Sequence, residues 1–149
     1  MKRYAEGTTV SVASSRGEIT GILAKHGVVR MGWQTGPLGD ELMFEVDGRT
    51  YRLPIRKPTE DSEVAWARSQ GQDVRYIDIA SRVEKEWRRR WRATVLLLKA
   101  KLEFADGETS TVARELMPYL LTAGGETLGD LVEAGRVPML KASRDEAVR

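Results

Sequence analysis

The residues best suited to chemistry in this chain are arginines interleaved with tryptophans, in the stretch WRRRWR from Trp87 to Arg92. Guanidinium groups bind phosphates through paired hydrogen bonds, and an exposed indole ring is a surface on which a base can stack. The cluster therefore predicts a surface for a nucleic-acid backbone or for an acidic protein.

The segment around the cluster predicts a long helix from Arg82 to Phe104. Its apolar residues recur at spacings of three and four and form one stripe: Val83, Trp87, Trp91, Val95, Leu98 and Leu102. From Arg82 to Lys101 the Lys and Arg residues exceed the acidic residues by about six charges. Such an excess must face water or an anion.

Two interpretations of this cluster are open. Trp87 and Trp91 lie on the apolar stripe, which favours burial over base stacking. The arginines either bind phosphates or an acidic partner, or they face solvent and pair with the acidic C-terminal region. A second contact surface is expected on the sheet, unless Trp33 instead closes the edge of the core. The predicted nucleic-acid-binding residues are Arg88, Arg89, Arg92, Lys99, Arg30, Arg52 and Trp33.

Catalysis finds little support in the sequence, and we expect no catalytic residue, no metal and no cofactor. His26 is the only histidine and lies at a predicted helix end, which favours a capping role. No cysteine is present to act as a nucleophile or a zinc ligand. Four carboxylates could gather around a metal, Asp73, Asp78, Glu84 and Glu86, but the last three fall on different helical faces.

The chain of 149 residues is expected to form a single domain, residues 1–149. Within it we expect a sheet-plus-helix half (1–55), a connector (56–81), a helical half (82–140) and a frayed tail (141–149). The lack of cysteine and of any long apolar run favours a cytoplasmic protein that does not enter a membrane.

The first half predicts a βαβββ arrangement. Residues Thr8 to Ala13 alternate like a strand, a capping box from Ser15 to Glu18 begins a short helix, and His26-Gly27 ends it. A strand from Val28 to Trp33 and a loop from Gln34 to Asp40 follow.

A hairpin from Glu41 to Ile55 is the clearest local prediction, because Asp47-Gly48 is a type I′ turn signal. The turn sets Phe44 opposite Tyr51, so the aromatic and aliphatic residues share one face. Met43, on the other face, suggests that this face is covered by the central helix or by a partner subunit. The fold class is therefore α+β, with a small sheet packed against the long basic helix.

The second half predicts short elements. A proline-rich connector from Pro54 to Ser62 leads to a short helix near Val64 to Ser69. After the central helix, Thr111 caps another short helix. Tyr119 to Leu121 is expected to form a brief strand, and a capping box at Thr127 begins a last helix that ends near Gly135.

The segment WRATVLLLKAKLEF, with WRRR before it and Gly125 to Asp130 after it, resembles an uncharacterised family of small phage, prophage and mobile-element proteins. The segment SRGEI from Ser15 to Ile19 and the alternating hairpin resemble the same family. The resemblance implies a bacterial or phage-encoded cytoplasmic protein, encoded among phage DNA-metabolism genes. The chain departs from the family in its less regular connector and in Asp130, where a glutamate is more usual, and no site residue is carried over.

The sequence thus predicts a non-enzymatic accessory protein that binds nucleic acid, specifically single-stranded DNA, in replication or recombination of a phage or mobile element. The alternative is a host-directed protein-interaction module that binds an acidic host protein, such as a bacterial enzyme or defence factor. An oligomeric assembly factor is a further alternative, and a homo-oligomer is compatible with the charge asymmetry along the chain.

Overall fold

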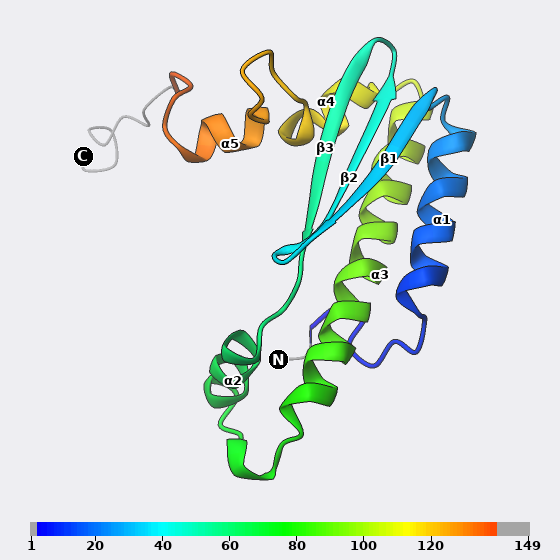
Figure 1. Cartoon of the computed structure of the whole chain (residues 1–149). Helices are drawn as coiled ribbons and strands as arrows, with labels where there is room; N and C mark the ends of the chain where they lie inside the picture. The colour runs from blue at the N-terminus through cyan, green and yellow to red at the C-terminus, as the bar shows by residue number, and fades with distance from the viewer. Residues whose placement is uncertain (1–2, 140–149) are drawn as a thin grey trace, which may run out of the picture.

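The structure is a computed structural model that describes residues 3–139. Its elements along the chain are α1 (Val12–Lys25), β1 (Arg30–Gly36), β2 (Gly39–Val46), β3 (Arg49–Arg56), α2 (Glu60–Ser69), η1 (Val74–Tyr76), α3 (Ile79–Asp106), α4 (Val112–Glu115), η2 (Met117–Tyr119) and α5 (Leu128–Glu133) (Figure 1). The α+β class is confirmed. The predicted frayed tail at 141–149 lies outside the described residues.

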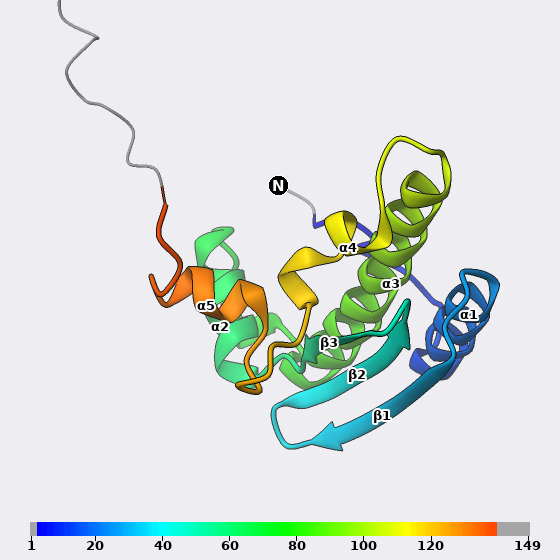
Figure 2. The same cartoon turned by 90° about the horizontal axis from the view of Figure 1, so that it is seen from above.

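The three strands form one antiparallel sheet in the order β1-β2-β3, and α1 and α3 lie on the same face of it (Figures 1 and 2). We call this the inner face, and the opposite one the outer face. The predicted hairpin register is confirmed, with Phe44 opposite Tyr51. Asp47 and Gly48 have φ values of 51° and 69°, as a type I′ turn requires.

The core lies between α3, α1 and the inner face. The buried stripe of α3 runs from Trp91 through Val95 and Leu98 to Leu102, and each of these side chains is at most 1% exposed. The indole of Trp91 packs against Trp33, with ring centroids 5.1 Å apart, and its other neighbour Trp87 is partly buried. The interpretation of these tryptophans as core residues is confirmed for Trp91.

The N-terminal predictions were partly wrong. Residues 8–10 form no strand, and α1 begins at Val12, where the hydroxyl of Ser11 accepts a hydrogen bond from the N–H of Ser14. Ser15, predicted as the helix cap, is fully buried inside α1. The first half is therefore αβββ rather than βαβββ. The helical spacing of apolar residues that pack α1 against α3 outweighs the short alternation around Val10 and Val12. The end of the helix at His26 and Gly27 is confirmed.

The predicted loop from Gln34 to Asp40 was also wrong. β1 continues to Gly36, a two-residue turn follows, and β2 begins at Gly39. Gly39 has φ 137°, and a Cβ there would lie 2.2 Å from the carbonyl oxygen of Ile55, so this close approach requires glycine. The strand β3 likewise continues through Pro54, which edge strands tolerate.

The C-terminal elements largely follow their capping signals. The carboxylate of Asp78 caps α3, Thr111 caps α4, and Thr127 with Asp130 forms a capping box at α5. The predicted strand at Tyr119 to Leu121 is reduced to isolated bridges. One of them joins Leu120 to Tyr51 and places this segment along the edge of β3. None of the helices described between residues 3 and 139 has the length and apolar character that a membrane crossing needs.

Candidate functional site

Four arginines of the central helix, Arg82, Arg89, Arg90 and Arg92, are bound to carboxylates of the same chain. Arg89 donates two hydrogen bonds to Glu86, at 2.7 and 2.9 Å, and Arg90 donates a third at 3.0 Å. Arg92 reaches across to α1 and pairs with Glu18. The predicted pairing of these arginines with the acidic C-terminal region was wrong, because nearer carboxylates on α1 and α3 satisfy them.

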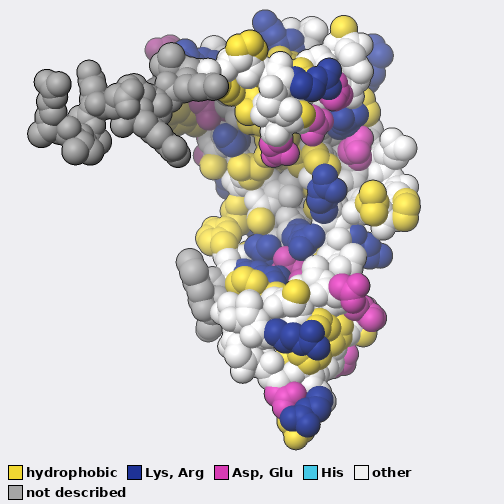
Figure 3. Space-filling model, turned by 90° about the vertical axis from the view of Figure 1, so that its left-hand side faces the viewer, with side chains coloured by type: hydrophobic (Ala, Val, Ile, Leu, Met, Phe, Trp, Pro, Cys, Tyr) yellow, Lys and Arg dark blue, Asp and Glu magenta, His cyan; other side chains and the backbone are white. Residues whose placement is uncertain are grey.

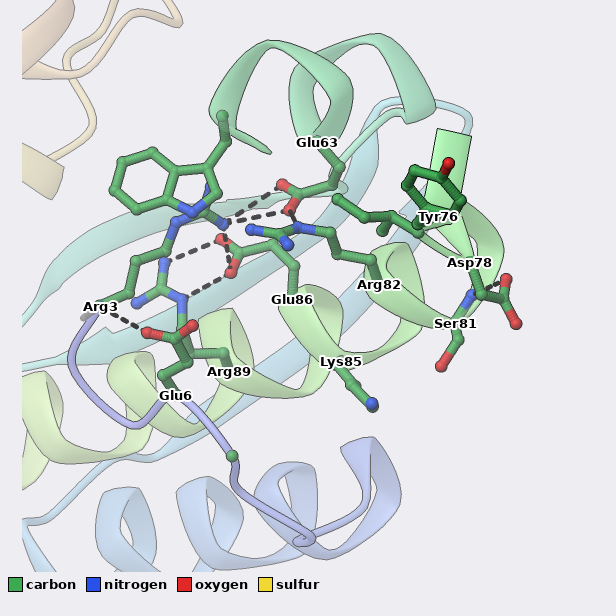
Figure 4. Close-up of a pocket in the computed structure, with 13 residues that line it drawn as sticks. Arg3, Glu6, Glu63, Tyr76, Asp78, Ser81, Arg82, Lys85, Glu86 and Arg89 are labelled. Atoms are coloured by element: carbon green, nitrogen blue, oxygen red, sulfur yellow. Dashed lines mark hydrogen bonds and ion pairs between the residues drawn. The ribbon is translucent and has the colours of Figure 1, made fainter. Parts of the chain in front are cut away.

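A charged network surrounds two buried glutamates near the N-terminus of α3 (Figure 4). The side chains of Glu63, on α2, and Glu86 are only 2% and 5% exposed. The guanidinium of Arg3 contacts both, at 3.2 and 2.7 Å, and Arg82 lies 3.4 Å from Glu63. We call Arg3, Arg82, Arg89, Arg90, Glu63 and Glu86 the Arg–Glu network. Buried charges are tolerated when they are paired in this way.

The ionisation of Glu86 reflects these contacts. Burial alone raises the pKa of its carboxyl, but the hydrogen bonds from Arg89, Arg90 and Arg3 outweigh burial and lower the pKa to about 2. Glu86 is therefore held as a carboxylate and does not act as an acid near neutral pH. The network attaches the N-terminal segment to the long helix, and through Glu63 it also attaches α2.

A cavity of about 410 Å³ lies beside the network, between the N-terminal segment, α2 and the start of α3. The ionisable groups in its wall are balanced, with cationic Arg3, Arg82, Lys85 and Arg89 and acidic Glu6, Glu63, Asp78 and Glu86. The cavity wall therefore has no surplus of charge of one sign. Within residues 3–139 no group of three histidine or acidic side chains is arranged to hold a metal ion.

Two predicted site residues on α3, Arg88 and Lys99, form no ion pair with any residue between 3 and 139. The Nε of Arg88 is buried without a hydrogen-bond partner among the described residues. Lys99 is exposed and lines a hollow of about 380 Å³ between α1 and α3, together with Lys25. The same hollow also contains Glu18 and Glu103, so the local charge is mixed.

The predicted second surface of Arg30, Arg52 and Trp33 does not exist as one surface. Arg30 is 84% exposed on the outer face, and Arg52 lies on the same face, 3.4 Å from Asp130 of α5. Trp33 lies on the inner face against Trp91. The reason is strand geometry, because residues 30 and 33 are an odd number apart and must point to opposite faces. That parity was readable in the sequence.

Among residues 3–139 no helix packs across the outer face of the sheet (Figures 1 and 2), although Asp130 of α5 reaches its β3 side, 3.4 Å from Arg52. A hollow of about 330 Å³ lies on it, and the half-buried side chain of Met43 lines this hollow between Arg30, Glu45 and Thr50. Figure 3 shows side chains of both charge signs beside hydrophobic ones on this side of the molecule. The prediction that the central helix covers the Met43 face was wrong, since α3 packs on the inner face.

Sequence reasoning missed three carboxylates that decide the electrostatics, namely Glu18, Glu63 and Glu86. Residues 3–139 contain as many basic as acidic side chains, because four of the Lys and Arg and two of the Asp and Glu lie outside them. The local excess on α3 is thus matched by acids on neighbouring elements. In the sequence, the spacing of Glu86 three and four residues before Arg89 and Arg90 was a signal for part of this pairing.

No family model, curated protein or solved structure matches the chain.

Proposed function

We propose that this protein is a non-enzymatic protein-interaction module that contacts its partner through the outer face of the sheet. The observation that carries the proposal is the uncovered hollow at Met43, where an apolar side chain lies among charges of both signs. Protein interfaces typically combine an apolar centre with a polar rim. The outer face has this composition on a rigid sheet.

The arrangement of charge favours a protein over a polyanion. Affinity for a nucleic-acid backbone comes from cations that replace condensed counterions. Arg89, Arg90 and Arg92 already have carboxylate partners, so each would have to break an ion pair before it met a phosphate. Mixed charges around Met43 instead select a partner with a complementary arrangement of both signs.

The resemblance to phage and mobile-element proteins suggests a host setting for this contact. In that setting the partner is a bacterial cytoplasmic protein, such as an enzyme or a defence factor, and the module acts by occupying its surface. Single-stranded DNA binding, the other function predicted from the sequence, rests on the remaining unpaired cations such as Lys25 and Lys99.

The test compares the wild type with Met43→Glu as baits in a pull-down from bacterial lysate, followed by titration calorimetry with the purified captured protein. Phe104→Glu is the control, because Phe104 is 52% exposed on α3 and does not belong to the sheet. We expect Met43→Glu to weaken binding at least tenfold while its melting temperature and that of the control stay near the wild type. Substitution of a buried side chain at the centre of an interface typically weakens binding by this much.

The same proteins are titrated with fluorescent single-stranded DNA at low salt. The proposal predicts binding that is weak and nearly independent of the Met43 substitution. Binding of DNA that weakens steeply with salt and is lost in Lys25→Glu/Lys99→Glu, with no protein captured through Met43, would replace the proposal with nucleic-acid binding.

A further inference from the structure

The outer edge of β1 is free. The opposite edge of the sheet, at β3, is occupied by the segment after η2, where the N–H of Leu121 donates to the carbonyl oxygen of Thr50 at 2.9 Å. Beside β1, by contrast, no segment of the described chain is paired on the side away from β2 (Figures 1 and 2). An edge strand of this kind presents a row of unpaired N–H and C=O groups.

The usual protections of an edge strand are missing from β1. Such strands are guarded by lysine, proline, bulges or inward-pointing charges. The sequence of β1 is RMGWQTG, and its pairing with β2 runs without a bulge from Arg30 opposite Glu45 to Gly36 opposite Gly39. Its one charged residue, Arg30, is at the first position. From Met31 to Gly36 the edge is open to another strand.

The free backbone groups belong to alternate residues. A two-residue turn closes on a hydrogen-bonded pair, here Gly36 and Gly39, and in an antiparallel ladder every second residue then directs its backbone to the neighbouring strand. Counting back from Gly36, the residues whose N–H and C=O groups point away from β2 are Met31, Trp33 and Thr35.

We propose that β1 pairs antiparallel with β1 of a second copy of this chain, about a two-fold axis at Trp33. This register sets Met31 opposite Thr35 of the second copy and Trp33 opposite itself. The residues with free backbone groups therefore face one another, as a hydrogen-bonded ladder requires. The result is one continuous sheet with the interface formed by the same strand on both copies, as a closed two-fold dimer needs.

The side chains agree with this register. In it Arg30 lies opposite Gly36 of the second copy, so no like charges meet. The ladder with the second copy is confined to residues 30–36, because residues 37 and 38 form the turn and the N–H of Val29 donates to the carbonyl oxygen of Glu45 on β2. Within that stretch the dimer places the two half-buried Trp33 rings side by side on the inner face.

The inference does not depend on the proposed function, because it uses the edge of the sheet and not the Met43 hollow. The dimer would, however, affect how the proposed module binds its partner. Pairing at β1 places the outer faces of both copies on one surface, so a partner with two matching sites would bind with avidity.

The first experiment measures mass in solution by light scattering and analytical ultracentrifugation over a concentration series. We expect the wild type and Met43→Glu to be dimeric, and Thr35→Pro to be monomeric with an unchanged circular dichroism spectrum. Proline at residue 35 removes an N–H that points away from β2, so it blocks the edge without breaking the β1–β2 ladder.

The second experiment tests the register with disulfides, which is possible because the chain has no cysteine. In the proposed ladder residue 32 lies opposite residue 34 of the second copy in a non-hydrogen-bonded pair, with Cα atoms about 4.5 Å apart, within the range of a disulfide. Gly32→Cys/Gln34→Cys should therefore cross-link rapidly into a covalent dimer, and Gln34→Cys alone should cross-link slowly.

Two results would overturn the inference. One is a wild type that stays monomeric at every concentration, and the other is a dimer that persists in Thr35→Pro or cross-links equally in the single and double cysteine variants. A monomer that still loses its partner in Met43→Glu would remove the dimer and leave the proposed function standing. A dimer that captures no Met43-dependent partner would support the inference and remove the proposed function.

Discussion

At the scale of single residues, Glu86 explains the most about this protein. It lies in the most basic part of α3, and it accepts hydrogen bonds from Arg89 and Arg90 on that helix and contacts Arg3 at 2.7 Å. A carboxylate this deeply buried is stable only while its cationic partners are present. The reverse also holds, because these guanidinium groups would repel one another without it.

The pH dependence of stability should report on Glu86. Its pKa is about 2, below the usual 4.5, so its ionised form stabilises the fold above pH 4.5 and this contribution is lost as the pH falls from 4.5 toward 2. Across that window the wild type should lose about 3 kcal/mol more unfolding free energy than Glu86→Gln, measured by urea titration. Glu84→Gln, at an exposed position of the same helix, is the control and should follow the wild type.

At the scale of elements, turns and caps decide where each segment begins and ends. Gly39 allows β2 to start directly after a two-residue turn, because its backbone passes too close to Ile55 for any side chain. The alternation around Val10 and Val12 is too short to hold a strand, since residues of α1 gain more by packing on α3. Burial against a neighbouring element thus outweighs a local pattern of a few residues.

Two glycine substitutions should therefore have opposite signs. Gly39→Ala is expected to lower the free energy of unfolding by about 1–3 kcal/mol, because the new Cβ would collide with the carbonyl oxygen of Ile55. Gly17→Ala, inside α1 and with open space around it, is expected to raise it by about 0.5–1 kcal/mol. Thermal and chemical unfolding of the two variants measure both values. Equal effects would show that the close approach at Gly39 is not rigid.

At the scale of the whole molecule, the central helix attaches its surroundings through charge as well as through its apolar stripe. Its cations bind α1 through Glu18, α2 through Glu63 and the region of α4 through Glu115. A helix that looks in the sequence like a binding surface for an anion is thus largely neutralised by the fold. Within the described residues, the sheet has no helix across its outer side and no strand beside the outer edge of β1.

Charge reversal on α3 distinguishes arginines that stabilise the fold from arginines that bind external ligands. Arg88→Glu/Arg89→Glu/Arg92→Glu should cost about 3–5 kcal/mol of stability, because it leaves the buried carboxylate of Glu86 without a main partner. Lys25→Glu/Lys85→Glu/Lys99→Glu makes the same change in net charge at cations without ion pairs, and should alter stability far less. Unfolding curves of both triple variants give the comparison. Similar stability of the two variants would mean that the arginines act on external ligands and not within the fold.

The sequence by itself determined the features that depend on neighbours along the chain. The Asp47-Gly48 turn fixed the hairpin register, the three-and-four spacing fixed the buried stripe of α3, and Thr127 with Asp130 fixed the start of α5. Each of these is a contact within a few residues, or a periodicity that one face of an element must satisfy. Such signals are complete in a short stretch of sequence.

Only the tertiary structure decided which groups meet. Arg92 and Glu18 are 74 residues apart, and Arg3 and Glu63 are 60 apart, and no period in the sequence relates them. The parity of β1 already separates Trp33 from Arg30 in the sequence, but only the packing of α1 and α3 decides which of the two sheet faces is covered. A charge has many possible partners along a chain, and packing selects one of them by bringing it within a few ångströms in a poorly solvated place. For this reason the sequence predicted a basic helix, while the fold decided that most of its arginines form ion pairs within the molecule.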